Sequence, residues 1–358
     1  MSSIEKRILK NGSTRFRLKW RDASGTQCSK TFRTKKDATE WDRKMRPETR
    51  EMSKATVGDY CKLFLESGSA RGWTESTEIR YAKQVRSILN NKISLIPVQN
   101  LRPRDVQDFV FGLSSDGHSE KGVRETHSRL HGVLKLAAQD GLIESLPTAY
   151  TTLPKKQSRH YPILDKEQVM ALSEEVPERY KIVVLLLAFT GIRWGELCAL
   201  RARDIHTDSP ALDIHGTIRQ GHEGFFRASE TKTRRSYRTV SVPQVLMPEL
   251  RARAAELDDD EELIFCTAAG RPWGSLGGDS WYHTAVKRLV KRGIIREKVS
   301  IHSLRHTAAS LMISSGLDAA AVARQLGHTT PATTMRVYTS FFESRLGGIG
   351  QVLDDIIK

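Results

Sequence analysis

The first part of the chain alternates between apolar and basic positions. Residues 15–20 (RFRLKW) place Phe, Leu and Trp on one side of an extended strand and Arg and Lys on the other. Asn11-Gly12 precedes this stretch and Ser24-Gly25 follows it, and both dipeptides are typical of tight turns. Residues 27–33 fit a further strand, and the segment from Lys35 onward fits a helix. We therefore predict a three-stranded sheet with one helix and one basic sheet face.

From Thr56 to about Ala149 the apolar spacing becomes that of helices. Pro103 stands where the first turn of a helix tolerates proline. We find no strand-like alternation in this stretch and predict a small domain of four or five helices. Two apolar faces at helical spacing support it: Tyr60, Leu63 and Phe64, then Leu130, Val133, Leu134 and Ala137.

The segment 151–161 (TTLPKKQSRHY) is polar, basic and bracketed by prolines, which is typical of an extended linker. The region after it mixes both kinds of pattern. Asp165 and Gln168 have the spacing of a capping box that opens a helix, and the apolar run 182–190 fits a buried helix. We predict short strands at 211–219, 225–228 and 237–242, and helices from about Asp279, Ser303, Asp318 and Pro331.

These patterns predict a multidomain α+β chain. It consists of a small three-stranded sheet with a helix, a helical domain, and a mostly helical domain with a small antiparallel sheet. The predicted segments are 1–54, 55–150, the linker 151–161, 162–346 and a tail 347–358. The tail follows a glycine-rich break and carries an apolar stripe, which either packs on its own domain or docks onto a neighbouring protomer. The stripe consists of Val352, Leu353, Ile356 and Ile357.

Length and charge add a partner to this picture. A chain of 358 residues exceeds what one hydrophobic core usually supports, in agreement with several domains. The formal net charge is +15, and residues 1–54 carry 16 Lys and Arg against 7 Asp and Glu, a net of +9. Composition alone fits a soluble basic protein equally well, but this concentration indicates a dedicated module for a polyanion such as DNA.

Several classes of protein are disfavoured. The four cysteines lie far apart without a CxxC pair, so we expect reduced thiols and neither a zinc knuckle nor a disulfide framework. The first residues contain no apolar stretch typical of a secretory signal. The longest apolar run, 182–190, is far shorter than the roughly 20 residues that span a bilayer. We therefore expect a cytoplasmic protein without membrane association.

Basic and hydroxyl side chains gather in short motifs of the last domain. Two guanidiniums can grip a phosphate in bidentate fashion and stabilise the charge of its transition state. A Lys or His can protonate a leaving oxygen, and a hydroxyl can trap the phosphorus covalently. We find no paired carboxylates for Mg²⁺ beside these motifs. The set that could cleave a phosphodiester is Arg193, Lys232, His302, Arg305, His328 and Tyr338.

Each of these residues alone is weak evidence, because a single Arg is usually a surface residue and a single buried His is usually structural. The i, i+4 spacing of His302 and His306 could also suggest a zinc-binding helix. However, Ser303 stands where the HExxH motif of zinc proteases has Glu. We predict neither a metal nor a cofactor.

Four separated motifs resemble the catalytic signature of the tyrosine recombinases, the phage integrase family. They are TGIRWGEL (190–197), HSLRHTAAS (302–310), LGH (326–328) and Tyr338, which follows His328 by ten residues. The resemblance covers about residues 160–345, with the motifs in the family's order. It implies a site-specific DNA recombinase, specifically an integrase of a phage or another mobile element.

The resemblance implies a role for each residue that contacts the phosphate. Arg193 and Arg305 would bind and activate the scissile phosphate, and His328 would donate a hydrogen bond to it. Glu196 matches the acidic residue that often follows the first Arg, and we expect it to orient its neighbours.

The resemblance also implies how bonds break and form. Tyr338 would form a 3′-phosphotyrosyl bond while His302 assists proton transfer. Lys232, on a β-hairpin, would be the general acid for the 5′-oxygen leaving group. By charge alone, Lys287 and Lys291 are alternatives to Lys232.

The partners follow from the same resemblance. It implies a homotetramer that exchanges strands between two double-stranded DNA sites through a four-way junction, without ATP. The helical segment resembles the core-binding domain of these enzymes, and residues 1–54 resemble an arm-type DNA-binding domain. With an arm-type domain, a host DNA-bending protein and an excisionase are candidate partners. The expected location is the cytoplasm of a bacterial host. The expected arm contacts are Arg15, Arg17, Lys19, Arg21, Lys30 and Arg33.

Two other functions stay open from the sequence. A type IB topoisomerase uses similar chemistry, but the arm-like module argues against it. A DNA-binding regulator on a decayed recombinase scaffold is the alternative without catalysis, and the intact set of reactive side chains argues against that.

Overall fold

The computed structural model describes residues 3–8, 13–21, 27–44, 54–156, 162–229, 237–328, 330 and 332. The chain divides into two compact units, residues 1–157 and 158–358, and the boundary falls inside the segment predicted as a linker. Lys232, Tyr338, the helix predicted from Pro331 and the tail 347–358 lie outside the described residues. Within the ranges described, none of the helices combines the length and the apolar character that crossing a membrane requires.

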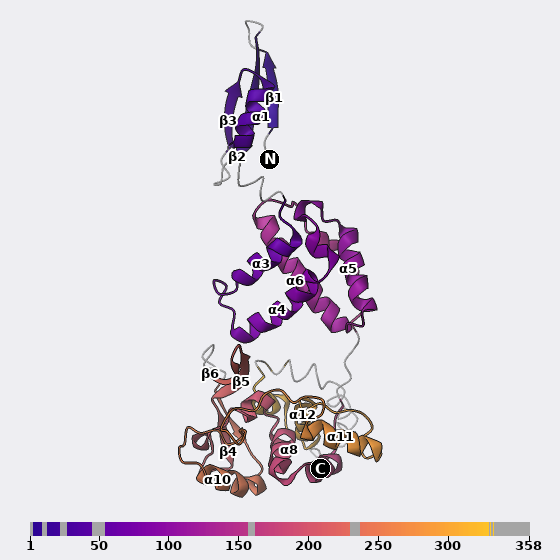
Figure 1. Cartoon of the computed structure of the whole chain (residues 1–358). Helices are drawn as coiled ribbons and strands as arrows, with labels where there is room; N and C mark the ends of the chain where they lie inside the picture. Colours follow the sequence, from indigo (N-terminus) through magenta and orange to yellow (C-terminus); the bar gives the residue numbers. More distant parts are fainter. Residues whose placement is uncertain are drawn as a thin grey trace, which may run out of the picture. The chain divides into compact units, whose positions relative to one another are not determined.

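The N-terminal module has the predicted sheet and helix (Figure 1). The strands run antiparallel in the order β1-β2-β3, and α1 packs on β2 and β3. Leu18 of β2 and Ala38 of α1 are fully buried between them, and the rings of Trp20 and Trp41 lie 4.9 Å apart. The elements are β1 (Ser3–Ile8), β2 (Thr14–Arg21), β3 (Gln27–Phe32) and α1 (Lys35–Lys44).

Residues 54–156 fold into four α-helices, within the predicted number. The predicted face of the last helix is confirmed, because Leu130, Val133, Leu134 and Ala137 are all fully buried. The prediction for Leu63 is wrong: its side chain is 48% exposed, because the buried stripe of its helix runs through Val57, Tyr60, Cys61 and Phe64. The helices are α3 (Val57–Glu66), α4 (Glu75–Leu89), α5 (Pro103–Ser115, with Pro103 at its start as predicted) and α6 (Glu120–Gln139), with 3-10 turns at Lys92–Leu95, Val98–Asn100 and Pro147–Tyr150.

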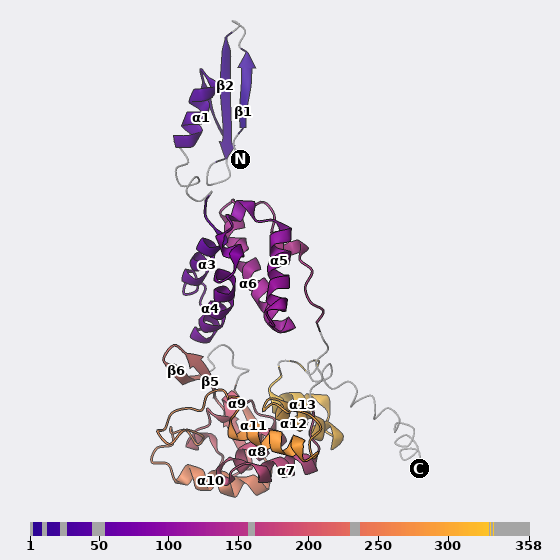
Figure 2. The same cartoon turned by 45° about the vertical axis from the view of Figure 1, so that its right-hand side comes forward.

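The second unit is mostly helical, and Figure 2 shows its helices gathered around α8. The capping box of Asp165 and Gln168 and the helix starts near Asp279, Ser303 and Asp318 are confirmed. The helices are α7 (Lys166–Glu175), α8 (Glu178–Thr190), α9 (Trp194–Leu197), α10 (Met247–Ala255), α11 (Trp281–Lys291), α12 (Ser303–Ser314) and α13 (Ala319–Leu326), with 3-10 turns at Ala202–Asp204 and Gln244–Leu246.

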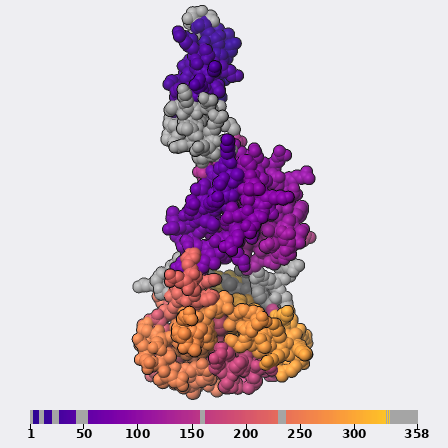
Figure 3. Space-filling model, viewed as in Figure 1, coloured from indigo at the N-terminus to yellow at the C-terminus, as the bar shows by residue number. Residues whose placement is uncertain are grey.

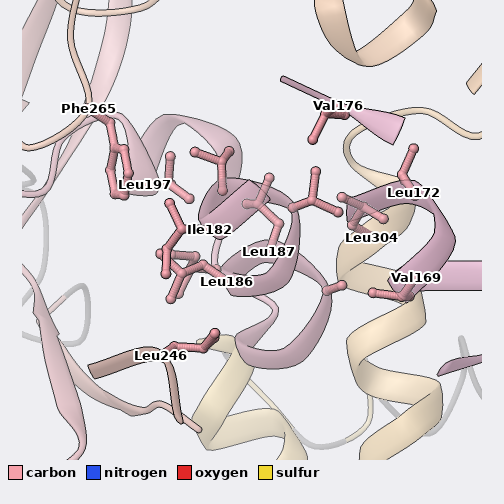
Figure 4. Packing of buried hydrophobic residues seen from close by; sticks show 14 of the residues in the cluster. Val169, Leu172, Val176, Ile182, Leu186, Leu187, Leu197, Leu246, Phe265 and Leu304 are labelled. Carbon is pink, nitrogen blue, oxygen red and sulfur yellow. The ribbon is translucent and has the colours of Figure 1, made fainter. Parts of the chain in front are cut away.

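Helix α8 is the centre of this unit's core. Its side chains are apolar on nearly every side, as the run 182–190 predicts, and α7 and α12 pack against it. Figure 4 shows Ile182, Leu186 and Leu187 of α8 among Leu172 of α7 and Leu304 of α12. A helix buried on all sides has little freedom to move, so the turn that follows α8 is held firmly in place.

The described strands of this unit form two two-stranded antiparallel sheets, where one small antiparallel sheet was predicted. The strands are β4 (Ala211–Ile214), β5 (Gly216–Gly221), β6 (Gly224–Ser229) and β7 (Arg238–Ser241). The predicted strand 211–219 is divided because the chain changes its pairing partner at His215: β4 pairs with β7, and β5 pairs with β6. Figure 3 shows the β5–β6 hairpin standing out from the body of the unit.

Lys232 lies in the segment between β6 and β7, outside the described residues. Its place on a β-hairpin therefore stays a prediction from the resemblance.

Candidate active site

Two glycines in left-handed conformation define the turns on which predicted site residues lie. Gly191 ends α8 with a φ of 72°, and Gly327 ends α13 with a φ of 69°. Residues with a Cβ rarely adopt this conformation, so both turns require glycine. The first turn makes Arg193 the N-cap residue of α9, and the second presents His328 directly after α13.

The two predicted arginines join these turns. Arg305, in the first turn of α12, is only 5% exposed, and its Nη1 donates a hydrogen bond to the Gly191 carbonyl at 2.6 Å. Arg193 donates from Nη2 to the Gly327 carbonyl at 3.2 Å, and its side chain is 43% exposed. The structure therefore brings the starts of α9 and α12 and the end of α13 together, with the Arg193 guanidinium accessible to an anion.

Burial and the positive charges of the same two arginines lower the pKa of both predicted histidines. Burial lowers the pKa of His302, and the charges of Arg305 and Arg193 lower it further. Burial, followed by Arg305 and Arg193, also lowers the pKa of His328 to about 4. Both imidazoles are therefore neutral at pH 7 and can either donate or accept a hydrogen bond. His302 is the N-cap residue of α12, which carries Arg305, and His328 follows Gly327, whose carbonyl accepts from Arg193, so the structure brings these four residues together.

His306 adds a further imidazole that the function predicted from the sequence does not use. Its ring centroid lies 5.4 Å from that of His302, at nearly a right angle. Burial and then the neighbouring His302 lower its pKa to about 4. Among the described residues, no group of three or more His, Cys, Asp or Glu side chains is placed to hold a metal ion.

Glu196, which the resemblance leads us to expect to orient its neighbours, contacts Arg193 at two points. Its carboxylate is 2% exposed and accepts hydrogen bonds from the Arg193 backbone N–H at 2.9 Å and from Arg193 Nη1 at 2.6 Å. Burial alone would raise the pKa of Glu196, but the guanidiniums of Arg238 and Arg193 outweigh this effect and hold the pKa at about 2. Glu196 is therefore ionised at pH 7, and its carboxylate holds the Arg193 side chain through the hydrogen bond from Nη1.

Arg238, at the start of β7, is a residue of this site that the motifs did not predict. Its Nη1 and Nη2 groups donate to the two carboxylate oxygens of Glu196 at 3.1 and 2.7 Å. In the sequence, Arg238 closes a segment that already contains Lys232 and two further arginines. Composition and spacing give no signal that distinguishes it from these neighbours.

Lys287, one of the two lysines that charge alone offers as the general acid, has a different environment. It contacts Asp279 Oδ1 at 3.1 Å, and its side chain is 54% exposed. Neither Lys232 nor the nucleophile Tyr338 is among the described residues. Their places in the site remain predictions from the motifs.

The sheet of the N-terminal module has a basic face opposite the one that α1 covers. The strand register places Arg15, Arg17 and Lys19 on this face, as predicted, together with Arg7, which was not predicted. Lys19 Nζ forms an ion pair with Glu5 at 2.6 Å on the same face. The face is therefore basic with one acidic residue in it.

Lys30, one of the expected arm contacts, lies on the other face of the sheet. Lys30 pairs opposite the buried Leu18, and its Nζ lies 4.7 Å from the ring centroid of Trp41 on α1. In β3, Cys28, Lys30 and Phe32 share this side, as strand alternation requires. Arg33 follows the end of β3 and is exposed, and the side chain of Arg21 lies outside what the structure describes.

Comparisons with known proteins show the family and the fold to which the chain is similar. Residues 162–345 match the model of the phage integrase family. An integrase of Mycobacterium phage FRAT1 is 27% identical over 311 residues, which cover 84% of this chain and 89% of the relative. The tyrosine recombinase XerA of Pyrococcus furiosus is 29% identical over 241 residues, which cover 66% of this chain and 75% of the relative.

Two solved structures share the fold at low identity. The Tn1549 transposon integrase in complex with transposon right end DNA has a TM-score of 0.68 at 17% identity and covers 78% of this chain and 94% of its own. A lambda integrase tetramer bound to a Holliday junction has a TM-score of 0.59 at 18% identity and covers 91% of this chain and 96% of its own. At these identities the similarity is one of fold.

Proposed function

Because this chain belongs to the phage integrase family and is a site-specific recombinase, we propose that the site around Arg193 and Arg305 holds the scissile phosphate of DNA. The single observation that carries this proposal is that hydrogen bonds of Arg305 and Arg193 connect the turns of the site. Arg305 donates to the Gly191 carbonyl in the turn before Arg193, and Arg193 donates to the Gly327 carbonyl in the turn before His328. The charges of both arginines also lower the pKa of His302 and that of His328. Two guanidiniums and a neutral imidazole in fixed positions suit a phosphodiester anion, whose charge grows in the transition state.

The proposed reaction is a transesterification at phosphorus. The Tyr338 phenol oxygen attacks the phosphorus and forms a 3′-phosphotyrosyl bond, and the bond from phosphorus to the 5′-oxygen breaks. His302, which is neutral at pH 7, accepts the phenol proton, and Lys232 protonates the leaving 5′-oxygen. An incoming 5′-hydroxyl reverses the step on a new strand, so the reaction needs no ATP.

The proposed partner is double-stranded DNA. The charge of the chain and the basic sheet face support it, and both solved structures described above contain DNA. We further propose a homotetramer that works through a four-way junction, by analogy with the lambda integrase tetramer on a Holliday junction. The biological outcome would be integration and excision of phage or mobile-element DNA in a bacterial cytoplasm, with a DNA-bending protein and an excisionase as candidate accessory partners.

The domain assignment belongs to this proposal. Residues 1–54 would bind arm-type sites, 55–150 core sites, and 162–346 would carry catalysis, with 151–161 as the linker. The boundary between the two compact units, at residues 157 and 158, supports a division at that linker.

A covalent-trapping experiment tests the reaction. Nicked, end-labelled duplexes drawn from the DNA that flanks the gene lose the attacking 5′-hydroxyl, so a covalent intermediate accumulates. We expect wild type to form a protein–DNA adduct that survives denaturant without metal or ATP, and Tyr338→Phe to bind the same duplex without forming it. Tight binding with no adduct from wild type would overturn the proposed reaction and favour a DNA-binding protein.

A further inference from the structure

Arg238 is buried where three elements of the site meet. Its side chain is 10% exposed, and its two Nη groups bind both carboxylate oxygens of Glu196. This bidentate geometry fits the planar fork of Arg, whereas Lys offers a point charge on a flexible stem. Arg238 is therefore placed to fix the orientation of the Glu196 carboxylate, not only its charge.

The same guanidinium also touches the turn that presents His328. Its Nε donates to the Gln325 carbonyl at 3.3 Å. A Cβ added to Gly327 would lie 2.8 Å from Cζ of Arg238, so the guanidinium lies directly against the glycine turn. Arg193 donates to the carbonyl of the same Gly327. The turn before His328 is thus held by two arginines, one from β7 and one from α9.

Gln325 completes the link between β7 and α13. Its Nε2 donates to the Ser241 carbonyl at 2.8 Å, and its Oε1 accepts from the Ser241 N–H at 3.1 Å. This pair attaches the end of α13 to the last residue of β7, the strand that begins with Arg238. A displacement of β7 therefore moves both the support of Arg193 and the turn of His328.

We propose that Arg238 is a positioning residue of strand cleavage, which holds Glu196 and the Gly327 turn so that Arg193 and His328 meet the same phosphate. Arg238 does not itself bind the phosphate, because both of its Nη groups are occupied by Glu196 and the side chain is buried. The inference rests on the proposed function, since it assigns Arg193 and His328 to the phosphate. It adds a residue of β7 to a site whose described members come from helices and their turns.

The test compares Arg238→Gln and Arg238→Lys with wild type on the nicked, labelled duplexes described above. We measure the single-turnover rate of adduct formation at saturating DNA, the dissociation constant for the same duplex, and the melting temperature. Loss of a residue that orients a metal ligand typically costs about 10–100-fold in activity, and we take the same range for a residue that orients a phosphate ligand. We expect a rate loss in this range for Arg238→Gln, with DNA affinity changed by less than about twofold, and only partial recovery in Arg238→Lys because the fork is missing.

Arg227→Gln is the matched control for loss of a buried arginine. Arg227, on β6, has a side chain that is 12% exposed, and it lies 4.0 Å from a carboxylate oxygen of Asp204 in the same unit. We expect it to lower the melting temperature without a comparable loss of the cleavage rate. Equal rate losses in the Arg227 and Arg238 variants at equal melting temperatures would show that Arg238 acts through stability alone and would overturn the proposal.

Two further measurements keep the inference separate from the proposed function. In a double-mutant cycle, Arg238→Gln should have little added effect on the rate in a Glu196→Gln background; additive losses would overturn the proposed route through Glu196.

Carbon-13 NMR of the Glu196 carboxyl, which needs no DNA, should show the pKa of this carboxyl rising in Arg238→Gln, with Arg193 as the remaining partner. An unchanged carboxyl pKa would sink the inference even if wild type cleaves DNA. A wild type that forms no adduct would sink the proposed function, whatever the NMR result.

Discussion

Gly191 and Leu326 are in such close contact that a Cβ at Gly191 would lie 2.3 Å from Cδ2 of Leu326. The first residue ends α8 and leads to Arg193, and the second ends α13 and leads to Gly327 and His328. The absence of a side chain at Gly191 therefore sets how closely the turns that carry Arg193 and His328 approach each other.

This contact predicts a stability cost for Gly191→Ala that exceeds backbone strain. Gly270 has a similar φ of 69° but no atom within 4 Å of an added Cβ, so Gly270→Ala measures strain alone. We expect Gly270→Ala to lower the free energy of unfolding by about 1–2 kcal/mol and Gly191→Ala by about 1–3 kcal/mol more, from overpacking. Urea unfolding of both variants measures the difference. Equal losses would mean that Leu326 moves aside freely.

Much of this site could be predicted from the sequence because its residues lie in local motifs. A glycine directly after a buried helix predicts the turn that presents Arg193, and the order HSLR predicts an Arg one turn after His302 on the same helix. Glu196 follows Arg193 at the spacing of a capping pair, so its role was also local. For these residues, neighbours in sequence are neighbours in space.

The features that the sequence did not predict depend on contacts between distant segments. Arg238 reaches Glu196 only because β7 pairs with β4, and that pairing depends on how the strands associate. The same reason explains why residues 211–219 were predicted as one strand: the change of partner at His215 leaves no local pattern. Lys30 differs, because the alternation of β3 alone places it on the side of Cys28 and Phe32.

The buried Glu196 carboxylate predicts an acid-sensitive contribution to stability. Its pKa is lowered from an ordinary 4.5 to about 2, so above pH 4.5 neither the unfolded nor the folded chain carries this proton. As the pH falls from 4.5 towards 2, the unfolded chain binds a proton that the folded chain does not, and stability is lost. We expect Glu196→Gln to remove this pH dependence and to cost about 3–5 kcal/mol at pH 7, because it leaves Arg238 buried without a counter-charge.

Urea unfolding at a series of pH values between 2 and 7 measures this effect. Glu249→Gln is the control, because Glu249 forms an ion pair with Arg253 at 2.8 Å but its side chain is 49% exposed. An exposed pair contributes at most about 1 kcal/mol. Parallel pH profiles for wild type and Glu196→Gln would contradict the assignment.

The histidines predict a second and separate pH window. The pKa of His306 and that of His328 are both lowered to about 4 by burial and neighbouring positive charge, so both rings stay neutral well below the usual 6.5. Between about 6.5 and 4 the unfolded chain binds these protons and the folded chain does not, so stability falls as the pH falls through this window. NMR titration of labelled histidines, assigned with His306→Gln and His328→Gln, should give midpoints near 4.

Addition of DNA makes the titration specific to the proposed site. A phosphate beside His328 favours its charged form and should raise that midpoint more than the midpoint of His306. Midpoints near 6.5 in the free protein would show that the rings are not buried in solution. An equal response of both rings to DNA would argue against a phosphate contact specific to His328.

The basic face of the N-terminal sheet predicts how DNA affinity depends on salt. If Arg7, Arg15 and Arg17 each bind a phosphate, the full-length triple variant with Gln at these positions should bind the candidate duplexes more weakly. Its log–log salt slope should be shallower by about 0.9 for each phosphate that the variant no longer neutralises.

Lys30→Gln is the matched control, because Lys30 lies on the opposite face beside Trp41 and its replacement should leave the slope unchanged. Fluorescence anisotropy between about 50 and 200 mM salt, a range over which such contacts change the affinity strongly, measures both. If Lys30→Gln lowered the slope and the triple variant did not, the DNA would lie on the α1 side of the sheet, and the assignment of the open face would be wrong.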